Sequence, residues 1–186
     1  MTELDKLRIF YKLKNVDRIN SVKNRKENPA EHTWSALMLA DYFISNFYED
    51  KLDRLKVYEL LMYHDIVEIE SGDTPLSPNR DKSHQKVLEE KSALILSKKI
   101  PNALSKKYLE LFNEFESGLT NESKFAKAIE QLDAEVHEMD YKEDWKGWTE
   151  EFLRKHKQKY FKEFPEVEVF FEESVEYCRN NGFFNQ

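Results

Sequence analysis

Glycine and proline are scarce in this chain, which has only 4 Gly and 5 Pro among 186 residues. Few residues are therefore available for tight turns, whereas 35% of all residues are charged. This composition is typical of long helices with short connections, and the length is enough to bury a sizeable core. We therefore predict an all-α fold, with residues 1–186 forming a single-domain helical bundle of about seven to eight helices.

Cysteine is rarer still. The single Cys178 excludes an internal disulfide and any zinc site built from cysteines. The N-terminal residues contain no apolar stretch of the signal-peptide kind, and no apolar run approaches the ~18 residues of a membrane span. The net charge of −7 offers no basic surface to a nucleic-acid polymer or an anionic membrane. We therefore expect a cytoplasmic protein that binds neither of these, although a local cation or metal can still hold a small phosphorylated ligand.

Helix boundaries are well marked in places. Asn28 is predicted to cap a helix, with Pro29 as its first residue and Glu31 completing a capping box. No segment shows a convincing alternation of apolar and polar residues, so no strand is expected. The helices are predicted at about residues 2–14, 29–47, 54–69, 82–99, 102–117, 122–141, 149–161 and 165–180.

Histidines and acids fall on the apolar faces of three of these helices. His32 has the helical spacing of a core residue, and His64 shares a face with Glu68 in "LLMYHDIVEIESGD". Asp65 lies a further ~100° around that helix, within reach of the groove between packed helices. Asp133 falls on the apolar stripe of "FAKAIEQLDAEVHEMDY". That stripe consists of Phe125, Ala128, Ile129, Leu132 and Val136.

Two buried carboxylates need a cation, because burying them unpaired would cost several kcal/mol each. The three helical segments offer no Lys or Arg at core positions. Two imidazoles and two carboxylates form a ligand set that suits Mn, Co, Fe, Ni or Zn better than Ca and that leaves positions for water. We therefore predict one divalent transition metal held by His32, His64, Asp65 and Asp133. A lone histidine on an apolar face is more often a hydrogen-bonded core residue, and His84, His137 and His156 are interpreted as surface residues.

Three motifs then resemble a known family. "AEHTW", "YHDIVEIESGD" and "EQLDAE" are similar to the HD superfamily of metal-dependent phosphohydrolases, whose ligand order is H…HD…D. His64 follows His32 by 32 positions, and Asp133 follows Asp65 by 68. The acids of "HDxxExxxGD", followed by "TP", resemble the branch that contains bacterial 5'-deoxynucleotidases and their eukaryotic HD-domain relatives. The resemblance covers about residues 13–141, the motif-bearing core, and leaves C-terminal helices at about residues 145–180.

The resemblance also implies roles for residues outside the ligand set. Arg18 is the best match to an arginine that orients the substrate phosphate, with Arg25 as its competitor. Glu68 corresponds to a catalytic carboxylate. Asp73 corresponds to a loop residue that meets substrate and helps to position the reacting water, and Thr74 to its neighbour in substrate binding. The family's usual tryptophan next to the arginine is missing here, and family members are commonly homodimers.

The sequence therefore predicts a metal-dependent phosphohydrolase that removes the 5'-phosphate of deoxynucleoside monophosphates. One alternative is an HD phosphohydrolase acting on a nucleoside triphosphate, a cyclic nucleotide or a phosphonate. Another is a non-catalytic helical protein that binds a metal or a nucleotide. Glu68 and Asp73 favour an enzyme, since a structural metal site needs neither. The preferred base and sugar, the physiological metal and the oligomeric state are left open.

Overall fold

The computed structural model describes residues 1–74, 76 and 84–184. These residues form an all-α fold, as predicted, and every helix among them is too short or too polar to cross a lipid bilayer. The α-helices are α1 (Glu3–Phe10), α2 (Pro29–Phe43), α3 (Arg54–Tyr63), α4 (Glu68–Ser71), α5 (Gln85–Ser97), α6 (Asn102–Ser117), α7 (Asn121–Glu138), α8 (Glu150–Lys157) and α9 (Pro165–Asn180). Short helical turns of other kinds are η1 (Tyr11–Asn15), η2 (Ile44–Tyr48), η3 (His64–Val67), η4 (Lys142–Trp145) and η5 (Gln158–Tyr160).

Local capping explains where several helices begin. Asn28 accepts from the backbone N–H groups of Ala30 and Glu31, and the Glu31 side chain reaches back to the Asn28 N–H, so the predicted capping box is confirmed. The predicted ranges 102–117 and 165–180 match α6 and α9. Residues 82 and 83, where another predicted helix begins, lie outside the described residues.

The predicted helix over residues 54–69 is wrong as a single helix. The α-helical pattern ends at Tyr63, the tighter 3-10 turn η3 follows, and α4 covers one further turn. His64 and Glu68 therefore do not lie on one regular α-helical face. A 3-10 helix has about three residues per turn, fewer than an α-helix, so side chains after Tyr63 point in different directions from those that a continuous α-helix would give.

A two-stranded pairing also departs from the sequence prediction. The strands β1 (Ser21–Val22) and β2 (Arg25–Lys26) are antiparallel and pair Ser21 with Lys26. Lys23 has a φ of 53° in the turn between them. Strands of two residues are too short to show a period-2 pattern, so the sequence could not reveal them.

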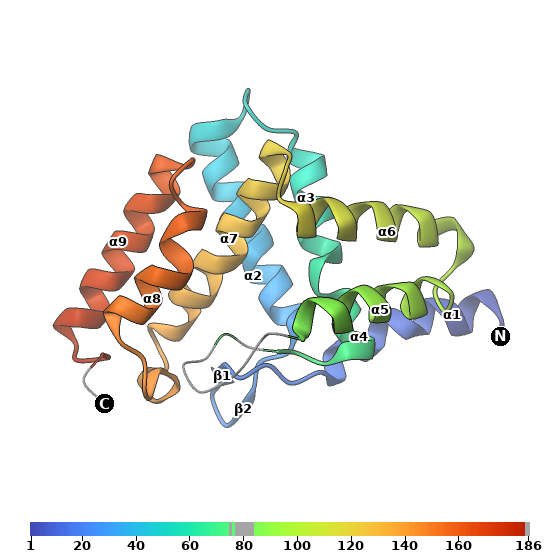
Figure 1. Cartoon of the computed structure of the whole chain (residues 1–186), viewed down its shortest axis with the longest axis horizontal. Coiled ribbons are helices and arrows are strands. Elements are labelled where there is room, and N and C mark those ends of the chain that lie inside the picture. Colours follow the sequence, from blue (N-terminus) through green and yellow to red (C-terminus); the bar gives the residue numbers. More distant parts are fainter. Residues whose placement is uncertain (75, 77–83, 185–186) are drawn as a thin grey trace.

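Three helices pack against one another at the centre of the fold. Figure 1 shows α2 and α7 side by side, with α3 next to both, α8 and α9 on one side of α7, and α5 and α6 on the other. Their fully buried apolar side chains are Ala36, Ala40, Phe43, Val57, Leu60, Leu61, Phe125, Ala126, Ala128, Ile129 and Leu132. The prediction for Val136 is wrong, since this side chain is 39% exposed near the end of α7.

Candidate metal centre and substrate cavity

Three of the predicted metal ligands meet where α2 and η3 approach each other. His32 lies on the buried face of α2 with Ala36 and Ala40, one and two turns further on, and is fully buried. The Asp65 Oδ2 atom lies 3.1 Å from Nε2 of His64 and 3.9 Å from Nε2 of His32. Ligand atoms of His32, His64 and Asp65 all fall within 4.8 Å of one another. This spacing is compatible with one shared cation.

Hydrogen bonds fix how the two imidazoles face this point. Nδ1 of His64 lies 2.6 Å from the carbonyl oxygen of Leu61, which can only accept, so Nδ1 carries the proton. Nδ1 of His32 lies 2.6 Å from Oδ2 of Asp133. Both Nε2 atoms are buried without a hydrogen-bond partner among the described residues. Two buried Nε2 atoms without a hydrogen-bond partner, beside a carboxylate, are the donor set that a divalent transition metal would satisfy on displacing any proton there, so the residues present fit such a metal.

Asp133 lies on the other side of His32. Its Oδ2 atom contacts Nδ1 of His32 and accepts a hydrogen bond of 3.0 Å from the Ser35 hydroxyl. A carboxylate on the remote ring nitrogen fixes the orientation and tautomer of a metal-binding imidazole. The structure thus brings Asp133 to the centre through His32, whereas direct coordination by Asp133 stays a prediction.

The charges around Asp65 favour its ionised form. Burial acts to raise the pKa of Asp65, but His64, His32 and Arg18 together hold this pKa well below its usual range. Burial likewise acts to lower the pKa of His64, and the charge of Asp65 outweighs it and raises that pKa. A carboxylate that stays anionic in a buried place is ready to bind a cation.

Arg18, and not Arg25, lies at the site. The Arg18 side chain is only 11% exposed, with NH1 3.2 Å from Oδ2 of Asp65 and Nε 3.0 Å from Oε2 of the buried Glu27. Arg25 is 55% exposed and pairs with Glu31 instead. Two carboxylates thus hold the Arg18 guanidinium beside the candidate metal centre.

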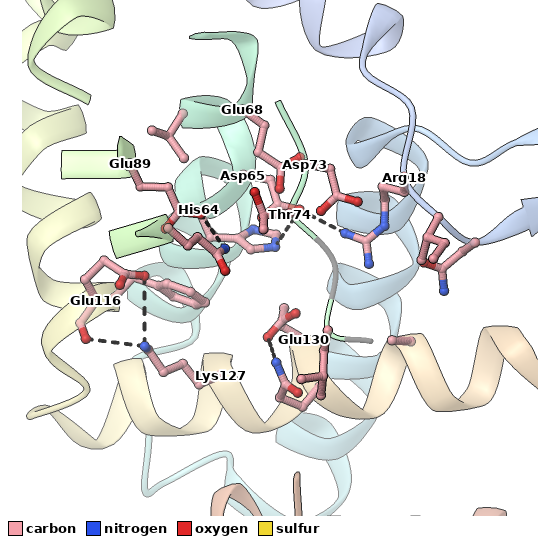
Figure 2. Close-up of a pocket in the computed structure, with 18 of the residues that line it drawn as sticks. Arg18, His64, Asp65, Glu68, Asp73, Thr74, Glu89, Glu116, Lys127 and Glu130 are labelled. Carbon is pink, nitrogen blue, oxygen red and sulfur yellow. Dashed lines mark hydrogen bonds and ion pairs between the residues drawn. The ribbon is translucent and has the colours of Figure 1, made fainter. Parts of the chain in front are cut away.

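A cavity of about 360 Å³ opens over this centre and is lined by Arg18, His64, Asp65 and the predicted residues Glu68, Asp73 and Thr74. Figure 2 shows the carboxylates of Glu68 and Asp73 on the same side of the cavity as Asp65, with Arg18 next to them. Gly72 ends α4 with a φ of 72°, a conformation that glycine adopts without strain, and leads the chain back to Asp73. All three predicted substrate-loop and catalytic residues therefore face the cavity.

Glu68 is held in an unusual state. It is 7% exposed, and its Oε2 atom has no hydrogen-bond partner among the described residues. Burial, followed by the charges of Asp65 and Asp73, raises the pKa of Glu68 to about 10. In this arrangement Glu68 carries a proton at neutral pH, next to the place where a substrate would lie.

The cavity also has lining residues that the sequence did not indicate. They include Asn20, Glu138, Trp148, Lys157 and Tyr160. One signal was present: on α7, the cavity-lining residues Lys127, Gln131, Ala134 and Glu138 follow one another at spacings of three or four. Nothing local in the sequence could show that Trp148 before α8, Lys157 at the end of α8 and Tyr160 in η5 line the same cavity.

Comparison with known proteins places this geometry in a family. The HD domain model matches residues 10–168. The chain belongs to the HD domain family. This HD protein is similar to the 5'-deoxynucleotidase HDDC2 of Mus musculus, with 26% identity over 140 residues that cover 74% of this chain and 68% of the mouse protein. The Homo sapiens protein of the same name is also 26% identical over 140 residues, covering 74% of this chain and 67% of its own length.

Solved structures share the fold of this HD protein. A predicted metal-dependent phosphohydrolase from Magnetospirillum magnetotacticum superimposes with a TM-score of 0.85 at 24% identity, covering 99% of this chain and 97% of that one. An HD-domain phosphohydrolase from Listeria innocua gives a TM-score of 0.61 at 20% identity, covering 94% of this chain and 84% of that one. At these identities the likeness shows the fold alone. The resemblance inferred from the motifs is confirmed by the family match.

Proposed function

We propose that this chain is a metal-dependent 5'-deoxynucleotidase that hydrolyses the 5'-phosphate of deoxynucleoside monophosphates. The observation that carries the proposal is the meeting of two unsatisfied imidazole Nε2 atoms, one ionised carboxylate and a buried arginine at one wall of a cavity. These groups suit a phosphate ester better than an uncharged substrate. The similarity to the HDDC2 proteins, which carry the name 5'-deoxynucleotidase, supports the substrate class.

The ligand set that we propose is His32, His64, Asp65 and Asp133, holding one Co, Mn, Fe, Ni or Zn ion. A divalent metal held there would polarise a phosphate oxygen and lower the pKa of a water. Asp133 would have a second role, since its contact with Nδ1 of His32 orients that ring with Nε2 toward the metal.

Arg18 is the residue that we propose to bind the phosphate. Its guanidinium is planar and permanently charged and can donate two parallel hydrogen bonds to phosphate oxygens. Nε of Arg18 forms an ion pair of 3.0 Å with Oε2 of Glu27, while NH1, an outer nitrogen, donates to Oδ2 of Asp65 at the cavity wall. Glu27 therefore holds Arg18 in the orientation that phosphate binding needs.

Glu68 is proposed to move the proton. Phosphoester cleavage leaves a nucleoside oxygen that must be protonated, and a buried carboxyl that holds a proton can donate it. Asp73 follows the Gly72 turn at the cavity wall, where its carboxylate can accept a hydrogen bond from the reacting water and orient it. Thr74, beside it, offers a hydroxyl to the sugar.

A phosphate-release screen tests this function directly. The purified protein would be supplied in turn with Mn, Co, Mg, Ni or Zn and with paired deoxy- and ribonucleoside monophosphates. We expect turnover with a transition metal and a higher kcat/KM for dAMP than for AMP. A pocket that leaves the ribose 2'-hydroxyl without a partner costs ~1–3 kcal/mol, which is ~5- to 150-fold in kcat/KM. Equal values for dAMP and AMP would contradict the deoxynucleotidase assignment, and turnover of only triphosphates or phosphonates would replace it.

The assembly and the location of the protein are part of the same proposal. We infer a homodimer of single-domain subunits in the cytoplasm, acting on a small-molecule deoxynucleotide and on no nucleic-acid polymer or membrane. Light scattering coupled to size-exclusion chromatography measures the subunit number, and limited proteolysis tests whether residues 1–186 behave as one unit. A monomeric mass at micromolar concentration would remove the dimer from the proposal.

A further inference from the structure

The segment that carries Arg18 has no apolar anchor in the core. Between residues 16 and 28, all of which the structure describes, no apolar side chain is buried, and Ile19 next to Arg18 is 42% exposed. The most buried residues of the segment are polar, since Asn20 is 4% exposed and Glu27 is 3% exposed. Burial of apolar surface therefore contributes little to fixing this segment, and hydrogen bonds and ion pairs must hold it in place.

Hydrogen bonds fasten this segment to the C-terminal end of α7 and to η4. The Asn20 amide donates to Oε1 of Glu138 at 2.6 Å, across 118 positions of the chain. The backbone N–H and the hydroxyl of Ser21 donate to the Asp144 carboxylate at 2.6 Å and 2.8 Å, and Nε2 of His137 lies 2.8 Å from the Ser21 carbonyl oxygen. Of these contacts, the one between Asn20 and Glu138 joins two buried side chains.

Glu27 connects the Asn20–Glu138 bond to Arg18. The backbone N–H of Glu27 donates to the carbonyl oxygen of Asn20 at 2.9 Å, and the backbone N–H of Arg18 donates to the carbonyl oxygen of Glu27 at 2.9 Å. The Glu27 carboxylate also forms the ion pair with Nε of Arg18. A displacement of Asn20 would therefore be passed on to the residue that orients the Arg18 guanidinium.

We propose that Asn20 is a positioning residue, which through its bond to Glu138 holds the Arg18 guanidinium where the substrate phosphate binds. Loss of this bond removes the buried anchor of the segment and leaves a buried carboxyl without its donor. Moving a substrate-positioning group by about 1 Å can lower a rate ~100-fold. The inference rests on the proposed function for the role of Arg18 and adds the residues that fix where Arg18 lies.

A double-mutant cycle with Arg18 tests whether Asn20 acts through that arginine. Asn20→Ala should keep the metal content and lower kcat/KM for dAMP by at least about 5-fold, from the loss of a hydrogen bond to a carboxyl group. In an Arg18→Ala background the same change should have an effect within about 2-fold, because no guanidinium remains to be positioned. A direct contact of Asn20 with the substrate, or a general loss of stability, would lower kcat/KM equally in both backgrounds and would overturn the inference.

Reversing the polarity of the bond tests the contact itself. Asn20→Asp places a second carboxyl against that of Glu138 and should lower kcat/KM at least as much as Asn20→Ala. Asn20→Asp/Glu138→Gln exchanges donor and acceptor across the same contact and keeps the summed charge of the pair, so it should recover most of the loss. Asn24→Ala is the matched control: it removes an amide from an exposed residue in the turn between β1 and β2, and it should stay within about 2-fold of the wild type.

Calorimetric titration with inorganic phosphate decides the inference without turnover, even if the chain hydrolyses no deoxynucleotide. Weaker phosphate binding in Asn20→Ala that Asn20→Asp/Glu138→Gln restores would support it. Unchanged binding in Asn20→Ala, a loss that the reversed pair does not restore, or a wild-type protein that binds no phosphate would overturn it. Hydrolysis of dAMP at the wild-type rate by Asn20→Ala would overturn the positioning role and leave the proposed function in place.

Discussion

Two buried groups of charged residues lie along one helix, α7, and their carboxylates are neutralised differently. At Asp133, the neighbouring residues supply imidazoles whose Nε2 atoms have no partner among the described residues. At Glu135, less than one turn further on, Lys157 supplies a cation from α8 at 2.5 Å. The charge of Glu135 is therefore neutralised by a lysine of the same chain. Around Asp133, by contrast, the histidine nitrogens and Asp65 converge on a point where a bound cation is needed.

The Glu135–Lys157 pair is a structural ion pair, whereas the residues around Asp133 form a site for a metal ligand. A buried carboxylate with its own lysine contributes to holding α8 against α7 and leaves little demand for a metal. Carboxylates grouped with imidazoles whose Nε2 atoms have no hydrogen-bond partner among the described residues create that demand. Burial of acids alone would not have distinguished the two, since Asp133 and Glu135 are 3% and 1% exposed.

Removing a predicted ligand should have the largest effect. His64→Ala or Asp133→Ala is expected to lose bound metal and nearly all turnover, because the remaining groups cannot complete the coordination. Elemental analysis of the purified variants measures the metal. His84→Ala, which changes an exposed histidine at the start of α5, is the control and should keep both metal and activity. Stoichiometric metal in both ligand variants would contradict the ligand set.

Removing the internal cation should destabilise the fold and leave metal binding intact. Lys157→Met leaves Glu135 buried without its partner, which costs about 3–5 kcal/mol in the free energy of unfolding. The loss should shrink as pH falls, because an unpaired buried carboxyl has a raised pKa and takes up a proton. Urea unfolding at pH 8 and pH 5 measures both effects. The double variant Lys157→Met/Glu135→Leu should recover most of the stability; an equally unstable double variant would show that packing, not charge, is responsible.

Glu68→Gln should separate proton transfer from metal binding. The amide keeps the size of the side chain but can neither gain nor release a proton at neutral pH. We expect normal metal content and a kcat lowered ~100-fold or more, the usual size of an acid–base contribution. Steady-state kinetics on the metal-loaded variant measure the loss, and a near wild-type kcat would remove Glu68 from the mechanism.

The smallest predicted effect distinguishes the two arginines. Arg18→Ala should lower kcat/KM by roughly 10- to 150-fold, the equivalent of ~1.5–3 kcal/mol for a hydrogen bond to a charged group. Arg25→Ala should stay within about 2-fold of the wild type, because the Arg25 guanidinium is 55% exposed and screened by water. Parallel assays with dAMP compare them. A larger loss in Arg25→Ala would reverse the assignment of the phosphate-binding residue.

Helical periodicity and capping in the sequence predicted most of the fold. Asn28, Pro29 and Glu31 fixed the start of α2 through local hydrogen bonds, which depend on near neighbours in the chain. His32 could be placed in the core because it repeats with Ala36 and Ala40 along a regular helix. Periodicity failed at Val136, near a helix end, where position on the apolar stripe no longer guarantees a neighbour to cover it.

By itself the sequence determined the helical class, the histidines and acids available for a metal, and the resemblance to HD proteins, because spacing within a helix and composition are local properties. Tertiary structure alone decided that Asp133 meets Nδ1 of His32, 101 positions away, and that Arg18 rather than Arg25 faces Asp65. It also decided that Lys157 comes from α8 to pair with Glu135 and to line the cavity beside Glu138. Such contacts depend on which helices pack together, a choice made by the burial of whole apolar faces and not by the polar residues that the packing brings into contact.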